Sequence, residues 1–214
     1  MPRHSLPRSH PEKGGRVATE RNGFDRAAWR VMVAASADPK RLVFVDECGL
    51  HTSLAQIYGY APRGERLRLS IPRSRGRNTT LLASMTIEGM GLSLAVEGAT
   101  TAGVFEAYVE RVLVPELRPG QIVVMDNLGA HKPKRVRELI EGQGCELLYL
   151  PAYSPDYNPI EEAFGKIKNL LRKAAARSKG ALVEATGAAL SAITAADARG
   201  FFEHAGYHPT GQIQ

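Results

Sequence analysis

Short apolar runs separated by turn-forming residues extend along most of the chain, and their lengths predict strands. The runs LVFVDE at 42–47, QIVVMDN at 121–127 and CELLYLP at 145–151 are rich in aliphatic residues, many of them β-branched, and predict buried strands. The runs at 79–87 and 92–98 flank the sequence Glu-Gly-Met-Gly and predict a hairpin. The chain therefore contains the pattern of a sheet.

Helical spacing and helix-end signals predict helices between and after these strands. The predicted helices are 25–36, 102–114, 132–144, 159–177 and 181–194. Residues 56–71 alternate loosely around APRGER and predict a strand, a turn and a strand. Because the early strands follow one another directly and the later ones are joined by helices, we expect a mixed α/β sheet with helices crossing between parallel strands.

The first 40 residues differ from the rest in composition. Residues 1–24 are rich in Arg, Pro, Gly and Ser, and residues 1–41 carry nine Lys or Arg against four Asp or Glu, which is +5 of the net charge of +6. The 214 residues are enough for one full domain and an extension. We expect a basic arm or linker at 1–40, a globular domain at 41–207 and a tail at 208–214.

Several classes of protein are excluded by what the sequence lacks. No run approaches the roughly 18 apolar residues that a membrane helix needs, and the first residues contain no apolar stretch typical of a secretory signal. Cys48 and Cys145 stand in no zinc-binding spacing. We expect two buried free thiols in a reducing cytoplasm and no membrane partner.

Basic residues gather in two tracts of the otherwise nearly neutral body. From Arg63 to Arg77 there are six Arg and one Glu, and from Lys166 to Lys179 there are six Lys or Arg and no acid. Such tracts suit a groove for a phosphate backbone, although they are equally compatible with ordinary solvated side chains. They favour a nucleic-acid partner without establishing one.

Three acidic residues are expected to meet at one edge of the sheet. Asp46 and Asp126 each follow a predicted buried strand, and Glu161 begins the helix predicted at 159–177. The carboxyl ends of strands form the edge at which α/β sheets bind ligands, and three carboxylates there could hold two divalent cations. Each acid alone also has a structural explanation. In particular, Glu161 stands at the capping-box position if Asn158 is the N-cap.

The helix predicted at 159–177 also carries basic residues that we expect beside this edge of the sheet. Steps of seven and eleven residues place Lys168 and Arg172 on the face of Glu161. A separate apolar stripe, expected in the core, consists of Ile160, Phe164, Ile167 and Leu171. His131, five residues after Asp126, could contact a phosphate or a metal-bound water, and a structural role in the loop is the alternative. We expect DNA contacts from Arg63, Arg73, Arg75, Arg77, His131, Lys132, Lys168 and Arg172.

Four segments together resemble a known family. VFVDE, APRGER, VVMDNLGAHK and LPAYSPDYNPIEEAFGKIK are similar to the catalytic half of bacterial insertion-sequence transposases of the IS six-thirty family, in the mariner superfamily. The resemblance covers residues 41–207. It implies a ribonuclease-H-like fold, a mixed five-stranded sheet flanked by helices, and a DDE triad at Asp46, Asp126 and Glu161. It also implies two Mg²⁺ or Mn²⁺ ions and cut-and-paste transposition into TA dinucleotides.

The resemblance also implies partners and a location. Element ends and target DNA would be the substrates, a homodimer would join two ends in a synaptic complex, and the protein would act at the nucleoid in the bacterial cytoplasm. Family members usually carry a long helix-turn-helix region before the first Asp, so we expect a second product of a split gene, or a truncated copy, with a separately encoded helix-turn-helix protein as a possible partner. Two alternatives stay open: a nuclease that cuts without strand transfer, and a non-catalytic DNA-binding relic.

Overall fold

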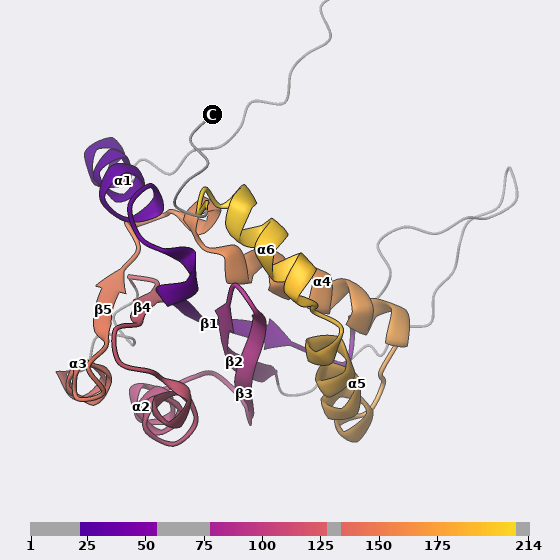
Figure 1. Ribbon diagram of the computed structural model, residues 1–214. Coiled ribbons are helices and arrows are strands. Elements are labelled where there is room, and N and C mark those ends of the chain that lie inside the picture. The colour runs from indigo at the N-terminus through magenta and orange to yellow at the C-terminus, as the bar shows by residue number, and fades with distance from the viewer. Residues whose placement is uncertain (1–21, 55–77, 128–133, 209–214) are drawn as a thin grey trace, which may run out of the picture.

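The centre of the molecule is a five-stranded mixed sheet in the order β3-β2-β1-β4-β5 (Figure 1). The computed structural model describes residues 22–54, 78–127 and 134–208. Strands β1, β2 and β3 pair antiparallel, whereas β4 is parallel to β1 and β5 is parallel to β4. The strands are β1 (Leu42–Leu50), β2 (Thr79–Thr86), β3 (Gly89–Glu97), β4 (Ile122–Met125) and β5 (Glu146–Tyr149). This confirms the predicted mixed sheet and hairpin, and the pair of strands predicted at 56–71 lies outside the described residues.

Strand β1 is longer than predicted, because it has different partners along its two edges. Its first residues pair in parallel with β4, from Leu42 opposite Ile122 to Val45 opposite Met125. Its other edge pairs with β2 as far as Leu50, which extends the strand beyond the predicted end. The expectation that the strand ends at its acids is therefore wrong. Asp46 lies within β1, at the point where the pairing with β4 stops.

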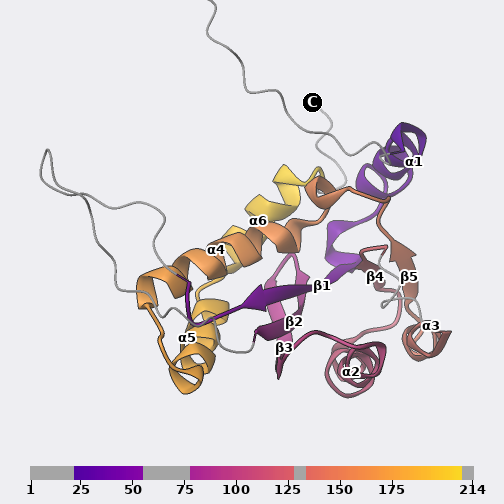
Figure 2. The same cartoon turned by 180° about the vertical axis from the view of Figure 1, so that it is seen from behind.

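Helices cover both faces of the sheet (Figures 1 and 2). On one face lie α4 (Pro159–Ala174), α5 (Lys179–Ser191) and α6 (Ala195–His204), which share a core cluster with alternate β1 residues such as Phe44. On the other face lie α2 (Ala102–Tyr108) and α3 (Lys134–Glu141), which share a cluster with Val43 and Val45. The two-residue period of a strand explains this division. The predicted apolar stripe of α4 is buried in the first cluster, as expected.

The helices agree with the predicted ones in place and differ at their ends. Helix α1 (Gly23–Trp29) continues as a π-helical turn to Ala34, and α2 continues in the same way to Leu113 before a 3₁₀ turn. Thr101 caps α2, since its hydroxyl accepts from the backbone N–H of Val104 at 3.3 Å. Helix α4 ends at Ala174, three residues before the predicted end, where Ala175 takes the left-handed conformation. Helix α6 was not predicted.

The packed body begins before Arg41. Trp29, in α1, is only 7% exposed and belongs to the core cluster beneath α4 and α6. Its indole N–H donates to the Tyr207 hydroxyl at 3.0 Å. The expected boundary after residue 40 would therefore separate α1 from the core into which it packs.

Two predictions from what the sequence lacks can be compared with the structure. Cys48 and Cys145 are both buried free thiols, as expected. Within the three described ranges, no helix combines the length and apolar character needed to span a membrane.

Candidate functional site

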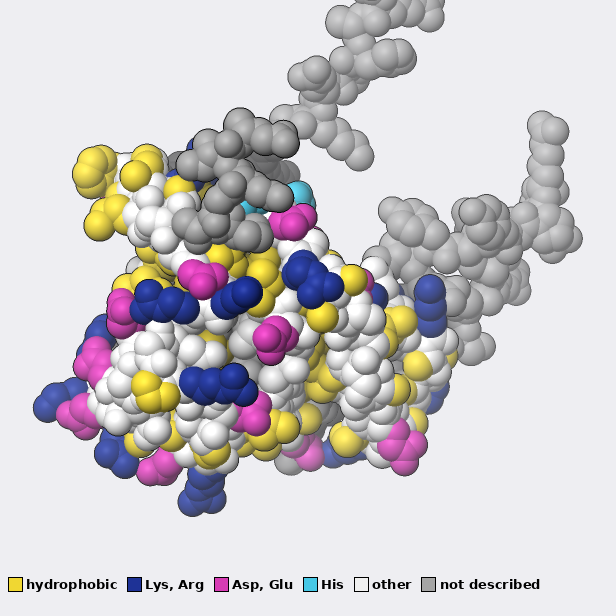
Figure 3. Space-filling model, viewed as in Figure 1, with side chains coloured by type: hydrophobic (Ala, Val, Ile, Leu, Met, Phe, Trp, Pro, Cys, Tyr) yellow, Lys and Arg dark blue, Asp and Glu magenta, His cyan; other side chains and the backbone are white. Residues whose placement is uncertain are grey.

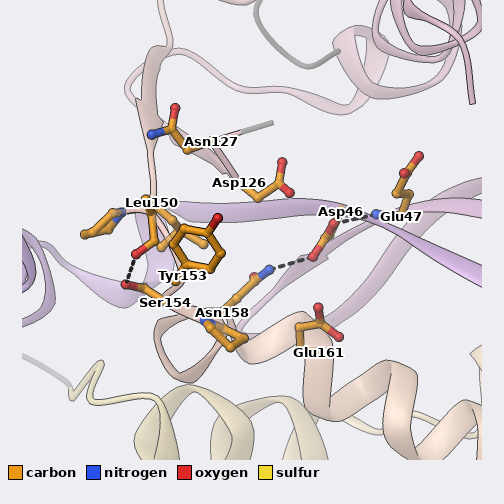
Figure 4. A pocket seen from close by; sticks show the side chains of 12 residues that line it. Asp46, Glu47, Asp126, Asn127, Leu150, Tyr153, Ser154, Asn158 and Glu161 are labelled. Carbon is orange, nitrogen blue, oxygen red and sulfur yellow. Dashed lines mark hydrogen bonds between the residues drawn. The ribbon is translucent and has the colours of Figure 1, made fainter. Parts of the chain in front are cut away.

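A pocket of about 510 Å³ opens where β4 ends beside β1 (Figure 4). Asp46, Asp126 and Glu161 all line it, although the sequence separates them widely. The structure therefore brings the three predicted carboxylates to one place. The other lining residues are Glu47, Asn127, Leu150, Pro151, Ala152, Tyr153, Ser154, Pro155 and Asn158.

The sheet places Asp46 and Asp126 next to each other. Val45 is opposite Met125 in the parallel ladder, and the acids are the next residues along the chain, Asp46 within β1 and Asp126 directly after the end of β4. Phe44 and Val124 belong to the same core cluster, so the period of two directs both acids to the face covered by α4. Neighbouring strands lie about 4.8 Å apart, which is why this register juxtaposes the carboxylates.

Asp46 is held in place by two hydrogen bonds. It is 6% exposed, and its Oδ1 accepts from the backbone N–H of Glu47 at 2.7 Å. Its Oδ2 accepts from the Nδ2 of Asn158, also at 2.7 Å. A buried carboxylate needs such donors, because an unpaired charge in the interior is costly. The side chain is therefore fixed in orientation before any ligand enters.

Glu161 reaches the pocket from the first turn of α4. The sequence left open whether Glu161 serves a capping box with Asn158, and the structure decides against it. Asn158 occupies the N-cap position, yet its side chain makes no capping hydrogen bond. A complete capping box is present instead at the start of α6, between Thr194 and Asp197. Glu161 is exposed, and its side chain lines the pocket.

The donors in the pocket suit a hard divalent cation. Mg²⁺ and Mn²⁺ prefer oxygen ligands, and the polar side chains that line the pocket are four carboxylates, two amides and two hydroxyls. Two of their oxygens, Oε2 of Glu47 and Oδ1 of Asn158, are buried without a hydrogen-bond partner among the described residues. As the side chains stand, no three carboxylate, imidazole or thiol groups in the described ranges are close enough to form a ready-made cation site. The residues are thus compatible in chemistry with cations, and the expected two-ion site stays a prediction.

Lys168 does not line the pocket, but it lies about two turns along α4 from Glu161, near Cys48. It lies close enough to Cys48 to lower the pKa of that thiol, although burial, the larger effect, raises the pKa above its usual value. The negative charges of Glu161 and Asp46 raise the same pKa further. The pKa of Cys48 therefore responds to Lys168, Glu161 and Asp46, so all three charged side chains lie near this thiol.

The remaining predicted DNA contacts are less informative. Arg172, farther along α4, donates to the side-chain oxygen of Asn169 at 2.7 Å. The other predicted contacts, Arg63, Arg73, Arg75, Arg77, His131 and Lys132, lie outside the described residues.

Sequence reasoning missed two side chains of the pocket. Asn158 was interpreted as a helix cap, and only the tertiary structure reveals that its amide faces Asp46. Tyr153 lines the pocket, is 57% exposed, and has a positive φ of 55°. A non-glycine residue in that conformation carries a strain of about 1 kcal/mol or more, and such residues cluster at functional sites. No local pattern of residues indicated either feature.

The sequence of residues 41–183 matches the family model described as DDE superfamily endonuclease. The chain belongs to this family. The match covers both strands that carry Asp46 and Asp126, and the helix that carries Glu161. No curated protein sequence matches the DDE endonuclease chain significantly.

Solved structures of Mos1 transposase resemble this DDE endonuclease domain. A pre-cleavage Mos1 transpososome is 17% identical with a TM-score of 0.73, over 92% of this chain and 64% of that one. A Mos1 mariner paired-end complex with Mn is 18% identical with a TM-score of 0.70, over 94% and 62%. The Mos1 catalytic domain with Raltegravir and Mn is 17% identical with a TM-score of 0.65, over 90% and 91%. The likeness confirms the ribonuclease-H-like fold, and the chain spans less than two thirds of the first two Mos1 chains.

Proposed function

We propose that this chain is the catalytic part of an insertion-sequence transposase, which cuts DNA at the ends of the element and joins them to target DNA. The observation that carries the proposal is the meeting of Asp46, Asp126 and Glu161 in one pocket of a DDE endonuclease domain. The motifs shared with the IS six-thirty family, and the transpososome and paired-end titles of the Mos1 structures, support the finer assignment. The bacterial nucleoid would then be the place of action.

The three carboxylates would hold two Mg²⁺ or Mn²⁺ ions. When bound, such a pair supplies charge neutralisation to the attacking and leaving oxygens of a phosphodiester. Asp46 would be the rigid ligand, because two hydrogen bonds fix its carboxylate. Asp126 joins it from the next strand, and Glu161 from α4. Lys168 would attract the phosphates beside the scissile bond.

The first test removes one carboxylate without changing its shape. Purified protein is expected to nick DNA that contains the element's ends in the presence of Mg²⁺ or Mn²⁺. Asp126→Asn should lower the nicking rate at least 1,000-fold, since a neutral amide is a poor ligand for a hard cation. Gel analysis of nicked plasmid measures the rate. Nicking by the variant at the wild-type rate would refute the assignment of the triad.

A second assay separates transposition from simple cleavage. Pre-cut element ends are incubated with a target plasmid and the divalent cation. A transposase makes joined products, whereas a nuclease makes only shorter fragments and a non-catalytic relic makes neither. Adding the separately encoded helix-turn-helix protein expected from the family should increase joining at genuine ends. The size of the joined complex on a sizing column tests whether a homodimer holds the two ends.

A further inference from the structure

Asn158 stands where an asparagine normally caps a helix, but its side chain does something else. An N-cap asparagine usually accepts a backbone N–H of the first turn with its side-chain oxygen, which stabilises a helix by about 1 kcal/mol. At the start of α4 this bond is absent. The amide is turned instead toward β1, where its nitrogen donates to Asp46 (Figure 4). The side chain therefore makes no capping hydrogen bond and instead bonds to a residue 112 positions away in the sequence.

The orientation of the amide follows from its neighbour. Only the NH₂ group can face Oδ2 of Asp46 at 2.7 Å, because two acceptors at that distance would repel each other. The carbonyl oxygen must therefore point elsewhere. It is buried and has no hydrogen-bond partner among the described residues, in a side chain that lines the pocket and is 4% exposed. Such an unsatisfied oxygen costs about 1–3 kcal/mol unless something in the pocket donates to it.

We infer that Asn158 is the residue that positions Asp46. Its Nδ2 fixes the rotation of the Asp46 carboxylate. This inference rests on the proposed function, because it takes Asp46 as a cation ligand. It concerns a residue outside the expected DDE triad, and it explains why the side chain does not cap α4.

The expected effect is on cation affinity. The hydrogen bond from Asn158 holds the Asp46 carboxylate in one rotation, so this ligand is ordered before a cation binds. Loss of a residue that orients a metal ligand typically weakens metal binding 10–100-fold. A residue that served only the helix would have no such effect.

The decisive variant is Asn158→Ser. Serine is as good an N-cap as asparagine, so α4 retains a residue that can cap it, while the donor to Asp46 is lost. Binding of Mn²⁺ to the full chain without DNA is measured by the electron paramagnetic resonance of free Mn²⁺. We expect affinity at least tenfold weaker than in the wild type. The half-saturating Mn²⁺ concentration for nicking should rise by a similar factor.

Asn169→Ser is the matched control. Asn169 lies on the same helix, is exposed, and does not line the pocket. It accepts from Arg172, so the same exchange removes an ordinary surface hydrogen bond. This variant should bind Mn²⁺ as the wild type does. Circular dichroism and the melting temperature establish that both variants are folded.

A measurement on the wild type covers the case in which Asn158→Ser does not fold. The side-chain NH₂ protons of Asn158, followed by nuclear magnetic resonance, should exchange with solvent far more slowly than those of Asn169, and should broaden at substoichiometric Mn²⁺. Exchange as fast as that of Asn169 overturns the inference, as does wild-type Mn²⁺ affinity in Asn158→Ser.

Asp126→Asn separates this outcome from failure of the proposed function. If Asp126→Asn loses Mn²⁺ binding and Asn158→Ser retains it, only the role of Asn158 is wrong. If Asp126→Asn also binds Mn²⁺ like the wild type, the cation site itself is misplaced, and both proposals fail.

Discussion

The side-chain contact of a single residue, Asn158, cannot be read from its local sequence. Asn158, followed by Pro159 and with Glu161 three positions on, has the spacing of an ordinary helix start. Its side chain nevertheless bonds across the fold to Asp46. The choice between the two bonds depends on where β1 lies relative to α4, and that information is not contained in the neighbouring residues. The three carboxylates were predictable, because acids at the end of an apolar run or at a helix start are visible in the pattern, although Asp46 lies inside β1 and not at its end.

Asp197 provides a pH-dependent contribution at the start of α6. Its carboxylate contacts the Lys166 ammonium at 2.6 Å and accepts from the backbone N–H and the hydroxyl of Thr194. The hydrogen bond from Lys166, followed by those from Thr194, lowers the pKa of Asp197 from 3.8 to about 2. Because the folded protein favours the ionised form, this stabilisation is fully present above the unfolded pKa and is lost as the pH falls toward 2.

The prediction is that Asp197→Asn destabilises the protein only where the wild-type residue is ionised. At pH 6 the variant should melt at a lower temperature than the wild type, and the gap should shrink as the pH is lowered from 4 toward 2. Thermal unfolding at a series of pH values measures this gap. A gap that stays constant over the whole series would contradict the role assigned to the charge.

At the scale of elements, helix α1 is fixed to the loop that leads into α4. Arg26 is 8% exposed and donates to the Ser154 hydroxyl at 2.7 Å and to both carboxylate oxygens of Asp156, at 2.9 and 2.5 Å. Its guanidinium also lies 4.3 Å from the centre of the Tyr157 ring. This two-pronged contact with a carboxylate requires the planar fork of arginine. The loop that forms one wall of the pocket is therefore supported by a helix from the start of the domain.

Removal of this contact should destabilise the domain measurably. We expect Arg26→Ala to lower the free energy of unfolding by about 2 kcal/mol, because it removes the donor to the buried Ser154 hydroxyl and the ion pair with Asp156. Arg26→Lys should recover only part of this loss, since lysine lacks the fork. Unfolding in urea provides the measurement. Arg30→Ala is the control: Arg30 is exposed, so loss of its 3.0 Å bond to Tyr157 should cost under about 1 kcal/mol.

Elements with strong periodicity were the predictable ones. The central strands are apolar runs, and α4 carries a clear apolar stripe, so both were found near their true limits. Helix α6 was missed because its sequence, AADARGFFEH, contains a glycine and buries few positions, chiefly Ala198 and Phe202. The last three residues of β1, Cys48–Leu50, were missed because Gly49 interrupts the apolar pattern, and their pairing with β2 is a long-range contact.

At the scale of the whole molecule, the described part of the chain is not basic. It carries 16 Lys or Arg and 19 Asp or Glu, whereas the remaining segments carry 12 and 3. On the face viewed in Figure 3 the two kinds of charge are interspersed. The excess of positive charge therefore belongs to 1–21, 55–77 and 128–133, which include most of the expected DNA contacts.

DNA binding should accordingly be dominated by counterion release. We expect affinity for a random duplex to fall steeply with salt and to show little sequence preference, because phosphate contacts carry no sequence information. Lys168→Ala should reduce the slope of log affinity against log salt by about 1. Fluorescence anisotropy at several salt concentrations measures the slope. Tight, salt-insensitive binding to one sequence would argue against this picture.

Shortened chains test where the domain begins. A chain without residues 1–40 loses Trp29 and Arg26 from the packed body, and we expect it to melt at least 10 °C lower or to aggregate, since removal of a buried tryptophan alone costs about 3–5 kcal/mol. A chain without residues 1–21 retains every described contact of α1. Its melting temperature should stay within about 2 °C of the full chain. Equal melting of both shortened chains would show that α1 contributes nothing to stability.

The order in which the pocket residues occur along the chain has a consequence during synthesis. Asp46 is made early and Asp126 in mid-chain, but Asn158 and Glu161 come only after about three quarters of the 214 residues. A nascent polypeptide still growing on the ribosome therefore carries an incomplete set of acids. If those acids perform the proposed cutting, a cell is spared strand breaks from unfinished or prematurely terminated translation products.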